Sequence, residues 1–172
     1  MKHLIAPAML AVLTIGLLVA DVKTDYSHSA DFRDLHTYSW LKVDAANPLW
    51  TDRIQRAVDQ ELAAKGLTKQ PNDGDIRVAA IGRTKESQTY TTFYNDLGGG
   101  WMWQGFGDGI STTTSEETPV GTLTVDLFNG KTKKLIWRGV ATKTLSDKPE
   151  KNEKKLQDAV AKMFDKFPPK ND

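Results

Sequence analysis

The side chains best suited to metal binding are two histidines near the start of the chain. His28 and His36 lie eight residues apart in a polar stretch that also contains Asp25, Asp31 and Asp34. A zinc site needs three or four converging ligands, and this stretch lacks the His-x-x-x-His spacing that brings two imidazoles to one face of a helix. We therefore expect solvated turn residues here, and the sequence predicts neither a metal site nor a cofactor.

Hydrolytic chemistry also lacks a complete set of residues. No Gly-x-Ser-x-Gly element presents a serine nucleophile, and Glu116 and Glu117 are sequence neighbours that would point to opposite faces of a strand. The Asn-Gly-Lys-Thr of residues 129–132 lacks the first glycine of a phosphate-binding loop. A hydrolase would have to bring together residues such as Asp126, Glu116 and His36, which no spacing predicts. We therefore expect a protein that is not an enzyme.

A segment rich in glycine and aromatic residues is the strongest candidate for a binding surface. Residues 97–109, LGGGWMWQGFGDG, include six glycines and lie in what we expect to be an insert at residues 94–112. The aromatic side chains in and just before this insert are Tyr90, Phe93, Tyr94, Trp101, Trp103 and Phe106. They could pack on the rest of the domain, bind a partner protein, or stack on sugar rings. The glycines argue against a rigid stacking platform, because glycine adds backbone freedom.

Two amphipathic helices are predicted to support these features. The first follows Asn47-Pro48 and ends before Gly66, with an apolar stripe of Trp50, Ile54, Ala57, Val58 and Leu62. The second begins near Pro149 and stops at Pro168-Pro169, with a stripe of Leu156, Val160, Met163, Phe164 and Phe167. Each helix therefore has one face to bury.

Alternating residues predict the sheet on which the helices pack. Residues 22–26, 37–43 and 75–83 read as strands, and residues 121–141 read as a hairpin with Asn129-Gly130 in a tight turn. The resulting order of elements favours an α+β two-layer sandwich, in which a largely antiparallel sheet carries both amphipathic helices on one face.

Within the predicted hairpin, alternation assigns two conspicuous side chains to opposite faces. Trp137 shares a face with Leu127, so core packing accounts for it. Arg138 points the other way, where we expect it to pair with Asp126 at the surface.

The start of the chain is typical of a secretory signal peptide. Lys2 precedes an apolar run from Leu4 to Ala20, and cleavage is expected between Ala20 and Asp21. An uncleaved membrane anchor is the alternative, because the run is close to the length that spans a bilayer. We expect residues 1–20 to direct export and residues 21–172 to form a single domain in the periplasm or cell envelope.

Charge and cysteine content exclude several kinds of site. Removal of Lys2 with the leader reduces the 23 basic residues to 22, which equals the 22 acidic residues, so nucleic acid is not an expected partner. The lysines of residues 148–155, KPEKNEKK, alternate with acidic and polar residues and are expected to be solvated. The absence of cysteine excludes disulfides, thiolate metal sites and a lipid-modified amino-terminal cysteine.

Two long stretches resemble a bacterial envelope family known as domain of unknown function 4136. They are VKTDYSHSADFRDLHTYSWL, residues 22–41, and the block from GTLTVDLFNGKTKKLIWRG to AKMFDKFPP, within residues 121–169. The resemblance covers nearly all of residues 22–169 and implies an exported domain, often carried by predicted lipoproteins, with no assigned activity or functional residues. It also implies that the aromatic and glycine-rich insert varies among members. Lipoprotein members have a cysteine at the cleavage site, whereas this chain has Val19-Ala20-Asp21.

Together these observations favour an exported, non-enzymatic binding or scaffolding domain whose contact surface is the aromatic insert. A carbohydrate- or peptidoglycan-binding module that uses Trp101 and Trp103 is the first alternative, and an unrecognised hydrolase is the second. The expected partner is an envelope protein or a glycan. Membrane contact is expected only through an uncleaved leader.

Overall fold

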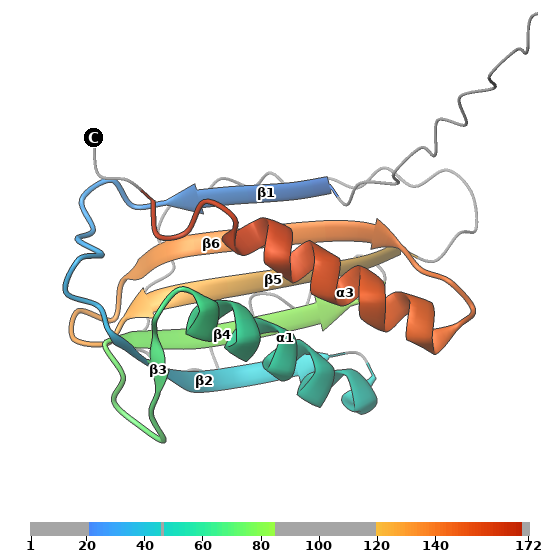
Figure 1. Ribbon diagram of the computed structural model, residues 1–172, viewed down its shortest axis with the longest axis horizontal. Helices are drawn as coiled ribbons and strands as arrows, with labels where there is room; N and C mark the ends of the chain where they lie inside the picture. Colours follow the sequence, from blue (N-terminus) through green and yellow to red (C-terminus); the bar gives the residue numbers. More distant parts are fainter. Residues whose placement is uncertain (1–20, 46, 85–119, 170–172) are drawn as a thin grey trace, which may run out of the picture.

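The computed structural model describes residues 21–45, 47–84 and 120–169, and it has two layers, an open sheet and a pair of helices (Figure 1). The sheet has six strands in the order β1-β6-β5-β4-β2-β3. The strands are β1 (Asp21–Tyr26), β2 (Thr37–Ala45), β3 (Thr68–Lys69), β4 (Ile76–Arg83), β5 (Val120–Asn129) and β6 (Leu135–Thr144). The helices are the 3-10 turn η1 (Pro48–Trp50), α1 (Thr51–Ala64) and α3 (Pro149–Phe164). This arrangement confirms the predicted α+β sandwich.

The sheet is antiparallel on one side and parallel on the other. β1, β6, β5 and β4 pair antiparallel, whereas β2 pairs parallel with both β4 and β3. Parallel neighbours require a crossover connection, and α1 supplies it between β2 and β4. Alternation located all of these strands except the two-residue β3, and it carried no information on their direction.

Helix α1 forms where its apolar stripe predicts. Asn47 caps the preceding turn, because its side-chain Oδ1 accepts a hydrogen bond from the Leu49 amide at 3.0 Å. The chain leaves the helix at Gly66, whose φ of 83° suits glycine. The face toward the sheet buries Ile54, Ala57, Val58 and Leu62.

Helix α3 lies beside α1 on the same face of the sheet and runs in the same direction (Figure 1). The Arg53 Nε lies 3.5 Å from a Glu153 carboxylate oxygen near the start of both helices, and the Lys65 Nζ donates to the Asp165 carbonyl oxygen at 3.3 Å near their ends. Val160, Met163 and Phe164 of the predicted stripe are buried, as is Ala159, whereas Leu156 is partly buried and Phe167 is buried beyond the end of the helix. Both helix N-termini therefore lie at the same end of the molecule.

The predicted hairpin is present, but its turn is longer than the tight turn expected at Asn129-Gly130. β5 continues to Asn129 and β6 begins at Leu135, so a longer turn joins them. The Asn129 side chain accepts hydrogen bonds from the amides of Lys131 and Thr132 at 3.0 and 2.8 Å, and Lys133 takes a φ of 61°. Gly130 is required for close approach, since a Cβ there would lie 2.2 Å from the Gly74 carbonyl oxygen.

The predicted pair between Arg138 and Asp126 is also present, but its surface location was wrong. The guanidinium binds the carboxylate in a two-point contact, at 2.5 Å and 2.6 Å, and the two residues are 7% and 1% exposed. They lie on the face of the sheet opposite the helices, where Ile81 and Phe128 are also buried. Alternation predicts which way a side chain points but not how deeply it is buried. Trp137 faces the helices, as predicted.

Candidate functional site

The aromatic side chains predicted for binding lie outside the described residues. These are Tyr90, Phe93, Tyr94, Trp101, Trp103 and Phe106. Ala20 and Glu116 also lie outside, whereas Asp21 begins β1. The contact surface and the cleavage site therefore stay predictions.

The other candidate side chains are held in separate local contacts. The backbone amide of His36 donates to the Asp75 carboxylate at 3.2 Å, the ring of His28 lies 4.6 Å from that of Tyr26, and Asp126 is paired with Arg138. Among the described residues, no group of three or more histidine, cysteine or acidic side chains could hold a metal ion.

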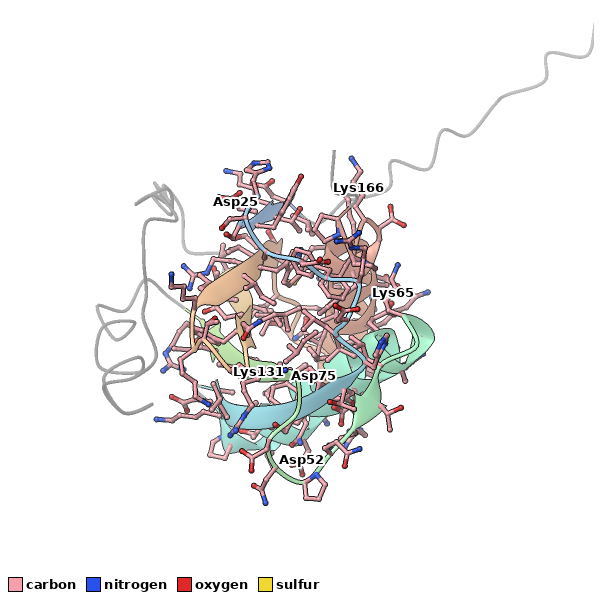
Figure 2. The ribbon with its side chains drawn as sticks, turned by 90° about the vertical axis from the view of Figure 1, so that its left-hand side faces the viewer. Asp25, Asp52, Lys65, Asp75, Lys131 and Lys166 are labelled. Carbon is pink, nitrogen blue, oxygen red and sulfur yellow. The ribbon has the colours of Figure 1, made fainter. Side chains whose placement is uncertain are left out.

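Asp75 anchors the turn before β4 to the start of β2. Its carboxylate accepts hydrogen bonds from the Thr37 hydroxyl at 2.7 Å and from the backbone amides of Thr37 and His36. The hydrogen bond from the Thr37 hydroxyl is the main cause of the lowered pKa of Asp75. The positive charge of Lys131, which lies at the same end of the molecule (Figure 2), lowers this pKa further. This is a structural role, since the contacts join two strands at their ends.

Asp59 has a similar role between helix α1 and the sheet. Its Oδ1 accepts hydrogen bonds from the Tyr38 hydroxyl at 2.9 Å and the Trp40 indole at 2.8 Å, and Lys69 lies 2.7 Å from its Oδ2. Burial, aided by the bond to Asp59, raises the pKa of the Tyr38 phenol. The phenol therefore stays neutral and acts as a fixed donor.

A cavity of about 210 Å³ lies between the two helices and the sheet, at the end where both helices begin. Its apolar walls are contributed by Trp50 and Ile54 from the α1 side, by Leu156 and Ala159 from α3, and by Leu123 and Ala141 from the sheet. Pockets of this kind, apolar inside with a few polar groups, are the usual form of a small-molecule site. We treat this cavity as the candidate functional site.

Small residues leave the cavity open. Ala45, Gly82, Gly121, Ala141 and Ala159 all line it. At Gly82, a Cβ would lie 3.0 Å from the Ile54 side chain, and at Gly121 it would lie 2.9 Å from Leu145. The glycines thus allow Ile54 and Leu145 to approach the strands, while the alanines do not reach far enough to fill the remaining space.

The charged side chains among the described lining of this cavity are all basic. Arg83, Lys143 and Lys155, which we call the basic rim, line the cavity together with Asn47 and Asn152, and none of its described lining residues is acidic. Arg83 is paired with Asp44 at 2.8 Å. The N-termini of α1 and α3 lie at the same end, and the helix dipoles make both partly positive. The electrostatics of the cavity therefore favour an anionic group.

Sequence reasoning missed the cavity and gave Lys155 a different role. Lys155 was expected on a solvated face, but it is partly buried and its Nζ donates to the Thr144 carbonyl oxygen at 2.9 Å. The signal that could have located it is the four-residue spacing between Lys155 and Ala159, which places both on one side of the helix. The strand residues Gly82 and Ala141 come from distant parts of the chain, and no local pattern joins them.

Comparisons with known proteins identify relatives of the chain. The family model of the Domain of unknown function (DUF4136) matches residues 22–169. A crystal structure of a DUF4136 family protein from Bacteroides thetaiotaomicron VPI-5482 is similar with a TM-score of 0.60 and 17% identity, covering 87% of this chain and 96% of that chain. No curated protein matches the chain.

Two further solved structures have a similar fold. A PDZ domain protein from Parabacteroides distasonis ATCC 8503 gives a TM-score of 0.59 at 15% identity, covering 88% of this chain and 36% of that one. The PelC dodecamer from Paraburkholderia phytofirmans gives 0.50 at 14% identity, covering 85% and 96%. At these identities the likeness concerns the fold alone, and none of the three descriptions names an enzyme. In the described part of this chain, no helix has the length and hydrophobicity needed to cross a membrane.

Proposed function

The chain belongs to the DUF4136 family, a domain of unknown function, and we propose that it is an exported, non-enzymatic binding domain of the bacterial cell envelope. The observation that carries this proposal is the cavity, which has an apolar interior, a basic rim and no acidic residue among its described lining residues. These features suit the binding of a ligand. They do not suit general acid–base catalysis by a pair of carboxylates, because the described lining has no carboxylate.

The export proposal rests on Lys2 and the apolar run from Leu4 to Ala20. Cleavage between Ala20 and Asp21 would leave a mature chain that begins with the first residue of β1 and keeps its whole pairing with β6. Measurement of the intact mass of the exported chain tests this: the expected mass is that of residues 21–172. A mass that includes residues 1–20 would mean that the leader is retained as an anchor.

The aromatic insert at residues 94–112 stays the proposed contact surface for an envelope protein. Cross-linking in intact cells, followed by recovery of the chain, should identify this partner, and the Trp101→Ala, Trp103→Ala double variant should lose it. An unchanged set of partners would remove the insert from the proposal. Recovery of a chain with no partner and no co-purified ligand, combined with hydrolysis of an envelope substrate, would overturn the binding function itself.

The glycan alternative depends on the same two tryptophans. Titration of the chain with envelope glycans, followed by tryptophan fluorescence, distinguishes it from a protein partner. A saturable spectral change that the double variant lacks would support glycan binding.

A further inference from the structure

The shape of the cavity limits what can occupy it. Its walls come from two helices and the sheet, and the lining is predominantly apolar side chains such as Ile54, Leu123 and Leu156. Water makes few hydrogen bonds against the apolar part of this lining, because each buried water needs two to four polar partners. An apolar cavity of about 150 Å³ can hold benzene, so by proportion about 210 Å³ accommodates roughly eight carbon atoms.

The basic rim selects the charge of the occupant. Arg83 already has Asp44 as its carboxylate partner. Lys155 differs: the contact found for its Nζ is with the neutral Thr144 carbonyl oxygen, and within the described residues no carboxylate forms an ion pair with it. Glu153, the acidic residue nearest to it in the sequence of α3, lies within 4 Å of both Arg53 and Arg56. An anion beside Lys155 would therefore neutralise a charge that the described contacts leave without a counter-ion.

The fold adds a second source of positive potential. α1 and α3 run in the same direction, so their N-terminal dipoles add at the cavity instead of cancelling. Lys143, from the end of β6, lines the cavity as well. A cationic head group would be repelled at this position, and a sugar would place hydroxyl groups against the apolar walls, where they have no hydrogen-bond partner.

From this arrangement we propose that the cavity binds a medium-length alkyl carboxylate, with the chain between Ile54, Leu156 and the sheet and the carboxylate beside Lys155. This ligand class rests on the proposed binding function and specifies it. The apolar walls supply affinity by removing the alkyl chain from water, and the rim supplies orientation and selectivity for negative charge.

Calorimetric titration of the exported chain with octanoate tests the proposal. Two ligands of the same chain length serve as comparisons, octylammonium with the opposite charge and octanol with none. Octanoate should bind in a one-to-one ratio and at least about tenfold more tightly than octylammonium, because a charge-assisted contact is worth about a factor of ten or more. Equal binding of both ions, or no binding of octanoate, would overturn the proposal.

Three variants locate the binding. Ala159→Leu should abolish octanoate binding by filling the cavity, and Lys155→Gln should weaken it about tenfold while leaving octanol binding unchanged. Lys154→Gln is the matched control, because Lys154 is the exposed neighbour of Lys155 and does not line the cavity. The thermal unfolding midpoint of each variant confirms that it folds. Undiminished binding by Ala159→Leu would place octanoate elsewhere and overturn the proposal.

An aromatic side chain of the protein is the alternative occupant of the cavity that the experiment must exclude. Binding of octanoate by the Trp101→Ala, Trp103→Ala double variant but not by the parent would assign the cavity to an aromatic side chain of the protein, and it too would overturn the ligand proposal. The cross-linking experiment keeps the two proposals separate. A chain that recovers an envelope partner but does not bind octanoate keeps its binding function and loses this ligand class.

Discussion

The two ends of the interface between the helices and the sheet are filled in different ways. At the end where α1 and α3 finish, Trp137 stacks on Phe164 with ring centroids 4.9 Å apart, and Phe167 contacts both rings edge-on at 5.6 Å. We call this the packed end. At the other end, the cavity end, alanine and glycine line a space of about 210 Å³.

This difference in side-chain size explains how a cavity can persist between the helices and the sheet. Helices are rigid, so the bulky rings at the packed end set how far α3 lies from the sheet along its whole length. Small residues at the cavity end, such as Ala141 and Ala159, cannot span that distance. The cavity is therefore a consequence of residue size at one end and ring packing at the other.

The largest expected effect comes from removing a ring at the packed end. Phe164 is fully buried, so Phe164→Ala should lower the free energy of unfolding by about 3–5 kcal/mol, measured by urea denaturation. Leu156→Ala at the cavity end is the matched comparison. It should cost less than about 2 kcal/mol, because Leu156 is only partly buried and already borders an open space. Equal losses would mean that the two ends are packed alike.

Adding atoms should have opposite effects at the two ends. Ala159→Leu fills the cavity and should raise the free energy of unfolding by about 0.5–2 kcal/mol. Gly139→Ala adds a Cβ that would lie 2.6 Å from the Trp137 ring and 3.0 Å from the Met163 sulfur, and it should cost about 1–3 kcal/mol. Urea denaturation measures both, and a loss of stability in Ala159→Leu would argue that the cavity cannot accept a larger side chain.

The smallest expected effect is a difference in acid sensitivity. Hydrogen bonds lower the pKa of Asp75, so its carboxylate stabilises the folded state at pH values above its unfolded pKa. That contribution is lost as the pH falls from about 4, the unfolded value, through the lower folded pKa. Asp75→Asn should therefore flatten the decline of the unfolding midpoint with falling pH.

Two controls test the assignment of this acid sensitivity to Asp75. The arginine in the Arg33–Asp31 pair lowers the pKa of Asp31 to about 2, so some acid sensitivity should remain in Asp75→Asn. Ala159→Leu should keep the full pH slope of the parent, since no acidic residue is among the described lining of the cavity. A flattened slope in Ala159→Leu would contradict the assignment of the acid sensitivity to Asp75 and Asp31.

The packed end was largely predictable from the sequence, and the cavity end was not. Helical spacing placed Val160, Met163 and Phe164 on one buried stripe, and strand alternation placed Trp137 opposite them. The same rules accept Ala159 as readily as leucine, because periodicity records whether a residue is apolar and not how much space it fills. The size of the cavity thus depends on the combined volumes of side chains from α1, α3 and four strands.

Local sequence patterns also did not predict burial on the face of the sheet opposite the helices. The Arg138–Asp126 pair followed from strand alternation, which carries no information on how deeply the two side chains are buried. The parallel pairing of β2 with β4 was missed for a related reason, since strand direction is decided by the crossover through α1 and not by the strand residues themselves.

The two edges of the sheet bear on how copies of this chain can assemble. At one edge, β3 has only two residues and pairs with Thr37 and Tyr38 of β2. At the other edge, β1 carries the exposed charges of Asp21, Lys23 and Asp25. Very short edge strands and charged edge strands both discourage the strand-to-strand addition that leads to aggregation. These features of β1 and β3 disfavour the addition of a strand from a second copy of the chain at those two strands.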